Sequence, residues 1–313
     1  MHTHTVDAGT DCPLTHPAHS EPSIELRRGA WQALLCDDPD AKCAAATALW
    51  AQAQTGVGKL DATTDLRSDK LGAPALSADT DADAVKVRPG RPARPRLIDP
   101  GQVPQRSVHT LEGRAALLHA ICHIEFNAVN LALDAVWRFP GMPPAFYLDW
   151  LRVAAEEASH FLLLRGLLRQ LPRAGTGAPW DYGDFDAHDG LWAMCEKTAS
   201  DITARMALVP RTLEARGLDA TPLIQGKLRK VNTPDALATV DALDIILRDE
   251  VGHVAIGNHW YRWLCDQQHL EPVSHYRTLA RRHSAPRLKP PFNEEARRRA
   301  GFTSLELEYL HGH

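Results

Sequence analysis

Hydrophobic positions recur with the spacing of an α-helix along most of the chain after residue 106, and no segment shows the alternation expected of a strand. Segments rich in proline, glycine, asparagine and aspartate separate the helical stretches, as the ends of helices require. Short breaks between long helices favour antiparallel neighbours. The pattern therefore predicts an all-α fold, an antiparallel four-helix bundle formed by Ser107–Arg138, Pro143–Leu171, His188–Arg216 and Pro234–Cys265.

The rest of the chain predicts segments outside this bundle. The first residues lack periodicity, and a later stretch of helical spacing is broken near Pro39. A following segment contains too many prolines to be helical, and we assign it no function. The predicted division is a disordered arm (1–22), an accessory helical hairpin (23–72), a Pro/Arg-rich extended linker (73–106), the bundle (107–267) and a C-terminal extension packed on the bundle (268–313).

Composition and charge narrow the class of protein. Of 313 residues, 44% are hydrophobic and 24% charged, which is ordinary for a soluble globular protein. A net charge of -4 gives no general attraction to nucleic acid or to an anionic membrane. No uninterrupted apolar run approaches the roughly 18 residues of a membrane span, and the N-terminus lacks the apolar stretch of a secretory signal. We expect a cytoplasmic protein that binds neither membrane nor nucleic acid.

The six cysteines are scattered and form no CxxC pair, so neither a zinc knuckle nor a disulfide framework is expected. Carboxylates and histidines are then the candidates for chemistry. Two Glu-x-x-His motifs stand out, Glu157 with His160 in the second helix and Glu250 with His253 in the fourth. The i,i+3 spacing places both side chains of a motif on one face of its helix. A dinuclear carboxylate site requires this motif on two helices and one inward glutamate on each of the other two.

The motif alone is weak evidence, because the chain has 16 histidines and a third match, Glu308 with His311, occurs in the tail. The heights of the ligands along the helices are a stronger test. The midpoint of Glu125 and Glu157 is Gly141, in the break FPGMPP, and the midpoint of Glu214 and Glu250 is Asn232, in the break VNTP. Each hairpin therefore brings its two glutamates to one level, roughly 25 Å from the turn. The predicted metal ligands are Glu125, Glu157, His160, Glu214, Glu250 and His253.

Other polar residues compete for the inward positions on the first and third helices. Glu125 shares the register of the apolar residues Leu118, Ile121 and Val129, whereas Glu112 lies near the helix start, where an acid complements the helix dipole. We therefore favour Glu125. The competitors are Glu112 and His123 on the first helix, and Glu196 and Asp201 on the third.

Acids beside the motifs have structural interpretations. Asp201 is suited either to orienting a ligand histidine or to an ion pair with Arg205, and both remain open. Glu156 points about 100° away from Glu157 around the helix, so we expect it to pair with Arg152. Asp249, beside Glu250, has the same choice.

The chain resembles the uncharacterised bacterial ferritin-like family known as domain of unknown function 455, in HIEFNAVNLALDAVWRF, FYLDWLRVAAEEASHFLLL, YGDFDAHDGLW, RMALVPRTLEARGLD and ILRDEVGHVAIGNHW. The resemblance covers nearly the whole chain. It implies a ferritin-like fold and the same six ligands, but no reaction. More distantly, Glu214-Ala-Arg216 followed by a later Glu-x-x-His is similar to tRNA-modifying di-iron hydroxylases. We do not transfer the tRNA substrate, because the chain is mildly acidic.

These residues lead us to expect two iron ions, with manganese or a mixed iron and manganese pair as alternatives. The expected function is the O2-dependent oxidation or hydroxylation of an unidentified small organic substrate. One alternative is a ferroxidase or another protein that handles iron or manganese. A second alternative is a metal-free scaffold, although buried unpaired carboxylates argue against it. An electron donor and a second copy of the chain are further partners that the sequence leaves open.

Overall fold

The all-α class is confirmed by a computed structural model, which describes residues 25–68 and 87–312. Within these ranges the chain forms helices joined by turns and extended segments, and its only β contacts are isolated bridges. The predicted disordered arm, residues 1–22, lies outside the described residues. The described part of the chain is therefore organised by helix packing alone.

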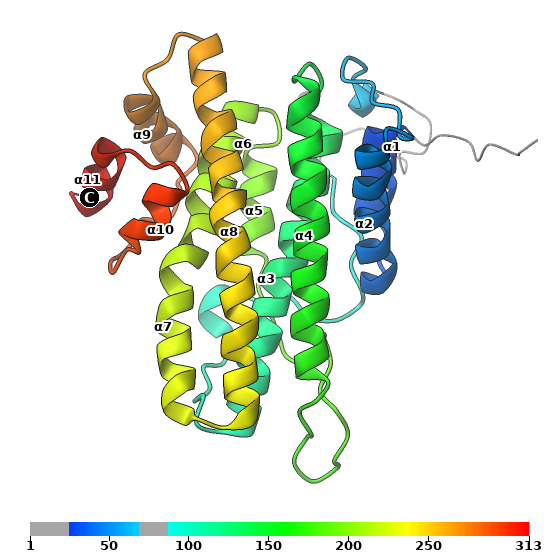
Figure 1. The fold of residues 1–313 in the computed structure, drawn as a ribbon, viewed down its shortest axis with the longest axis vertical. Coiled ribbons are helices and arrows are strands. Elements are labelled where there is room, and N and C mark those ends of the chain that lie inside the picture. Colours follow the sequence, from blue (N-terminus) through cyan, green and yellow to red (C-terminus); the bar gives the residue numbers. More distant parts are fainter. Residues whose placement is uncertain (1–24, 69–86, 313) are drawn as a thin grey trace, which may run out of the picture.

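Four helical columns form the centre of the described chain, and Figure 1 shows them side by side. Three are the single helices α3 (Leu111–Arg138), α4 (Pro144–Leu168) and α8 (Pro234–Gln267). The other column consists of α6 (Ile202–Leu208), the π-helix η3 (Val209–Glu214) and α7 (Ala215–Val231). The chain reverses between α3 and α4 at Gly141, with φ 81°, and between α7 and α8 at Asn232, with φ 55°. Both left-handed residues lie at the turns that the sequence predicts.

The prediction of one continuous third helix over His188–Arg216 is wrong. The segment contains the short helix α5 (Gly190–Lys197), a break, and then α6 and η3. The predicted end of this helix at Arg216 is wrong as well, because α7 continues to Val231 with Gly217 and Pro222 inside it. Helix packing in the columns outweighs the low helix propensity of glycine and proline here.

Asp201 has neither of the two roles considered from the sequence. Its side chain caps α6 by accepting the N–H of Ala204 at 2.9 Å. Arg205 forms its ion pair with Asp134 instead. The break before α6 therefore has a local cause, an aspartate cap, and the arginine is used in the core.

Helices outside the columns cover two opposite sides (Figure 1). The hairpin of α1 (Leu26–Leu35) and α2 (Pro39–Thr55) packs against α3 and α4. The C-terminal helices pack near α6, α7 and α8. The remaining elements are η1 (Leu66–Ser68), η2 (Pro100–Gln102), α9 (Pro272–Arg282), α10 (Glu294–Arg299) and α11 (Ser304–His311).

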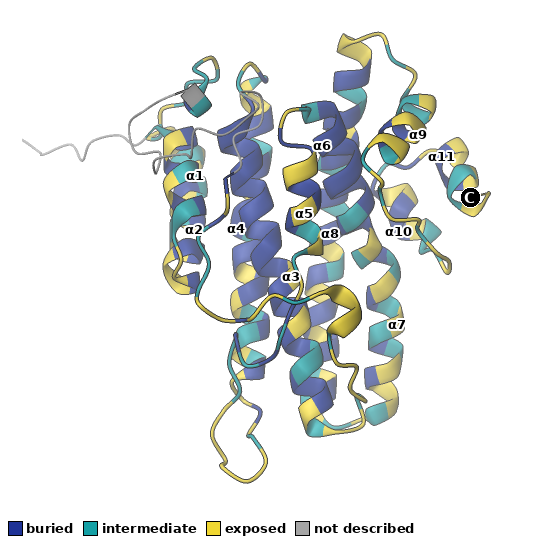
Figure 2. Cartoon of the chain, turned by 180° about the vertical axis from the view of Figure 1, so that it is seen from behind, coloured by how far each residue is buried: buried dark blue, intermediate teal, exposed yellow. Residues whose placement is uncertain are grey.

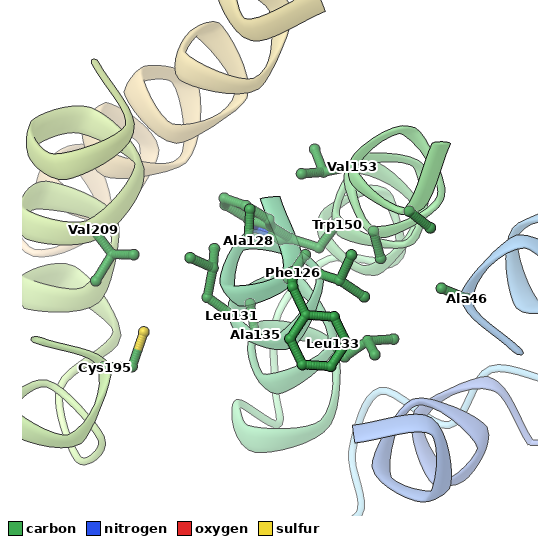
Figure 3. Close-up of a cluster of buried hydrophobic side chains, with 14 of the residues drawn as sticks. Ala46, Phe126, Ala128, Leu131, Leu133, Ala135, Trp150, Val153, Cys195 and Val209 are labelled. Atoms are coloured by element: carbon green, nitrogen blue, oxygen red, sulfur yellow. The ribbon is translucent and has the colours of Figure 1, made fainter. Parts of the chain in front are cut away.

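Helix α3 is the central element of the core. Figure 3 shows its side chains between Trp150 and Val153 of α4 on one side and Cys195 and Val209 on the other. Exposed residues gather on the outer helices and connecting segments, and buried residues line the columns (Figure 2). Among the described helices, α3 alone has the length and composition of a membrane span, but 78% of that window is buried inside the fold. Its apolar character is accounted for by this central position.

Candidate metal centre

The six predicted ligands all have buried side chains in the central columns. Their exposed fractions range from 0% for Glu157 and His253 to 8% for Glu250. Each column contributes: Glu125 from α3, Glu157 and His160 from α4, Glu214 from η3, and Glu250 and His253 from α8.

Five of the six side chains form two overlapping groups. Glu125, Glu157 and His160 place ligand atoms within 4.8 Å of one another, and so do Glu157, Glu250 and His253. Glu157 belongs to both groups: its Oε1 lies 2.8 Å from Nδ1 of His253, and its Oε2 lies 3.3 Å from Nδ1 of His160. This carboxylate therefore lies between two positions, each of which also has a histidine and a second glutamate.

Glu214 lies outside both groups but faces the same region. Both of its carboxylate oxygens are buried without a hydrogen bond, and its pKa responds to the charges of Glu157 and His253. It is the last residue of the π-helix η3, a conformation often found at functional sites. Helix α8 approaches η3 closely at Gly257, where a Cβ atom would lie only 2.6 Å from Cβ of Pro210.

Both histidines are fixed on their outer nitrogens by an acid from the opposite helix. Nε2 of His253 lies 2.8 Å from Oε2 of Glu156, and Nε2 of His160 lies 3.2 Å from Oδ2 of Asp249. In the neutral form of each ring, Nε2 keeps its proton and donates a hydrogen bond to that acid, and Nδ1 then has a lone pair that faces the glutamates. Such outer carboxylates orient ligand histidines and increase their basicity.

Sequence reasoning missed this role of Glu156 and Asp249. The expected ion pair of Glu156 with Arg152 is present at 3.0 Å, and Asp249 pairs with Arg248 at 2.8 Å. These contacts coexist with the contacts to the histidines. A signal was available in the sequence, because both motifs have an acid directly before the glutamate, as Glu156-Glu157-x-x-His160 and Asp249-Glu250-x-x-His253.

The polar atoms of this cluster lack partners to an unusual degree. No arginine or lysine forms an ion pair with the four glutamates within the described residues. A buried carboxylate oxygen without a hydrogen bond destabilises a fold by about 1–3 kcal/mol or more. Divalent cations would satisfy these donors, and mixed carboxylate and imidazole donors suit iron and manganese. The atoms without a hydrogen bond are Oε2 of Glu125, both Oε of Glu214 and Oε2 of Glu250, together with Oε1 of Glu157 and Nδ1 of His253, which face each other as an ion pair at 2.8 Å.

The pKa values of the glutamates describe which groups are protonated when no metal is bound. Burial and the charge of Glu157 raise the pKa of Glu125 and of Glu214 to about 8, and that of Glu250 well above its usual value. Burial opposes ionisation of Glu157 too, but His253 and His160 overcome it and hold its pKa well below the usual range. Protons shared in this way are exchanged for metal when a cation binds.

The competing residues make contacts elsewhere. Glu112 is exposed and pairs with Arg106 at 3.0 Å. Glu196 accepts the indole N–H of Trp192 at 3.1 Å. Nδ1 of His123 lies 2.8 Å from the hydroxyl of Tyr182. In the tail motif, His311 forms a surface pair with Glu294.

Comparisons with known proteins describe relatives without assigning a role. A family model described as "Protein of unknown function (DUF455)" matches residues 35–308. A Haemophilus influenzae protein described as uncharacterized is 49% identical over 227 residues, which cover 70% of this chain and 75% of that protein. No solved structure matches the chain.

Proposed function

The chain belongs to the DUF455 family, whose function is unknown, and we propose from its buried cluster that it is a dinuclear metal protein, with iron as the favoured metal. We infer further that the four columns are a ferritin-like four-helix bundle around that centre. The proposed activity is the O2-dependent oxidation or hydroxylation of a small organic substrate in the cytoplasm.

One observation carries the proposal: three buried glutamates and two histidines form two overlapping groups of possible ligands, and no arginine or lysine among the described residues neutralises them. A metal-free scaffold would have to retain these unpaired groups at a cost in stability. Two bound cations would neutralise these groups, and the interaction would stabilise the fold.

Each residue has a definite role in this proposal. Glu125 and His160 would hold one ion, Glu250 and His253 the other, and Glu157 would bridge them, as its place in both groups suggests. Glu214 would supply a further carboxylate from η3. When bound, two iron ions would supply the capacity to bind and reduce O2.

The surrounding chain positions these donors and excludes water. Glu156 and Asp249 hold the outer protons of the two imidazoles and thereby keep each Nδ1 available. The six ligand side chains are themselves at most 8% exposed, so little water reaches them. A dry surrounding strengthens the electrostatic attraction between carboxylates and cations.

The decisive experiment measures metal content by elemental analysis of the full chain, purified without chelator from iron-supplemented cells. We expect two transition-metal ions per chain, and their loss in the Glu157→Ala and His253→Ala variants. Glu308→Ala is the matched control, because Glu308 belongs to the exposed tail copy of the same motif. A parent protein that stays metal-free would contradict the proposal and favour the scaffold.

Optical spectra after anaerobic reduction and exposure to air then separate the two metal-dependent functions. A spectral change that requires O2, together with substrate-dependent O2 consumption, supports an oxidase or hydroxylase. Two bound ions that consume O2 only while iron is supplied would support a ferroxidase, and ions without O2 chemistry would indicate metal handling.

A further inference from the structure

A second potential ligand site lies on the surface between α8 and the end of α10. It is a pocket of about 290 Å³, close to the smallest volumes typical of ligand pockets, roughly 300 Å³. It is lined by six residues of α8 and by the segment from Arg299 to Gly301. The side chains that matter for recognition are Asn258, His259, Arg262, Trp263, Asp266 and Arg299.

Cationic donors dominate one part of the lining. Arg299 is exposed, and its guanidinium forms no ion pair or hydrogen bond within the ranges that the structure describes. Arg262 uses Nη2 to bind the carbonyl of Gly301 at 2.5 Å and Oε2 of Glu306 at 2.8 Å. Its other guanidinium N–H groups form no hydrogen bond with described residues. Two guanidinium groups with unused donors favour a carboxylate, whose geometry matches theirs.

An acceptor without a partner lies in the same lining. Asn258 is only 1% exposed. Its Nδ2 donates to the carbonyl of Ala300 at 2.7 Å, while its Oδ1 is buried without a hydrogen bond. This oxygen is fully buried, so a ligand in the pocket does not reach it. The accessible acceptor of the lining is the carboxylate of Asp266, which is exposed. The ligand should therefore carry a hydroxyl or amino group as well as an acid.

The indole of Trp263 provides the apolar wall of the pocket. It contacts Trp260, with ring centroids 5.7 Å apart, and Trp260 in turn is fixed by a hydrogen bond to Asp149 at 2.9 Å. A supported indole presents a flat surface on which a planar group can pack.

We propose that this pocket binds a small, flat organic acid that also carries a hydroxyl or amino group. The acid pairs with Arg299 and Arg262, the flat part packs on Trp263, and the hydroxyl or amino group donates to the carboxylate of Asp266. None of these residues belongs to the metal cluster, so the proposal does not depend on the proposed function.

Isothermal titration calorimetry on the full chain without added metal tests the pocket, with 4-hydroxybenzoate as the probe. Phenol lacks the acid, and benzoate lacks the hydroxyl. We expect saturable binding of one probe molecule per chain, about tenfold weaker binding of phenol, and about fivefold weaker binding of benzoate, since charged hydrogen bonds contribute more than neutral ones.

Arg299→Gln is the variant that isolates recognition. Arg262 is unsuitable, because it also holds Gly301 and Glu306 of the C-terminal segment. We expect Arg299→Gln to weaken binding of the probe about tenfold. Arg282→Gln is the control, because it removes the same charge at an exposed position of α9 outside the pocket.

Two results would overturn the proposal. One is an Arg299→Gln protein that binds the probe as tightly as the parent, while its thermal unfolding shows an intact fold. The other is the lack of saturable binding of the probe up to about 10 mM, beyond which binding is too weak to be specific.

Discussion

Two acids on α3, nine residues apart, are buried in very different charge environments. Asp134 is 0% exposed and lies between two arginines. Arg138 binds it through Nη2 at 2.7 Å, and Arg205 binds its other oxygen. Arg205 further donates to Thr198 Oγ1 at 2.9 Å and to the carbonyl of Cys195 at 2.6 Å. Glu125 is 3% exposed and has no arginine or lysine partner among the described residues.

Their pKa values move in opposite directions. Burial alone would raise both, but Arg138 and Arg205 hold the pKa of Asp134 below its usual value. Burial and the nearby Glu157 raise the pKa of Glu125 to about 8. A buried charge is therefore no sign of a binding site by itself. The distinguishing property is a set of buried ionisable groups with shifted pKa values that no arginine or lysine accompanies.

The largest expected effect is on stability, when Asp134 loses its charge. Asp134→Asn leaves two buried guanidiniums beside a neutral amide, and we expect the free energy of unfolding to fall by about 3–5 kcal/mol. Urea unfolding should show the same loss with and without metal. A loss below about 1 kcal/mol would mean that the ion pairs are not structural.

The same type of substitution at Glu125 should behave differently. Glutamine resembles the protonated form of Glu125, which predominates below the pKa of about 8. We expect Glu125→Gln to change the unfolding free energy of the metal-free protein by less than about 1 kcal/mol. Metal affinity, measured by competition with a chelator, should fall at least about 100-fold. Destabilisation as large as that of Asp134→Asn would make the cluster structural.

A smaller effect is expected at the acids that hold the histidines. Glu156→Gln and Asp249→Asn weaken the contacts to His253 and His160, and we expect metal affinity to fall about 10–100-fold in each. Arg248→Gln is the control, because it removes the surface partner of Asp249 and keeps the contact to His160. Equal losses in the control and in Asp249→Asn would argue against the orienting role.

The last prediction concerns pH. Glu125 and Glu214 keep their protons up to about pH 8 in the folded chain, against an ordinary pKa of 4.5. Between these values the folded state binds more protons, so its stability falls as pH rises. His160, whose pKa contacts with Glu125 and Glu157 raise to about 12 despite burial, acts in the same direction above pH 6.5.

We therefore expect thermal unfolding of the metal-free protein to shift downward between pH 5 and pH 8. Glu157, with its lowered pKa, has the opposite effect only below pH 4.5. Bound metal replaces the protons, so the loaded protein should lose less stability over this range. Equal pH dependence with and without metal would refute proton exchange at the cluster.

The sequence predicted three columns well. Helices α3, α4 and α8 differ from the predicted ranges by at most four residues at either end, because each has a long apolar register and a clear turn. The prediction failed for the column of α6, η3 and α7, and the reason is physical. A π-helix interrupts the α-helical period within this column. Beyond the predicted end at Arg216, α7 continues through Pro222, a residue that normally ends a helix.

Within the candidate site, spacing and ligand height found the inward glutamates and histidines. They could not find the role of Glu156, because its contact with His253 spans 97 residues and two helices. The π-helical path of the chain through η3, which positions Glu214, could not be predicted either, because the prediction assumed α-helical spacing.

The π-helix constrains how the length of this segment can change during evolution. A single extra residue in a helix rotates everything on one side by about 100° relative to the other. Losing one residue from Val209–Glu214 would let the column close into a regular α-helix, but it would turn α6 or Glu214 away from its present neighbours. We therefore expect no insertions or deletions within Val209–Glu214, although they are common in loops. Relatives that retain the counterpart of Glu214 should retain the length of this segment.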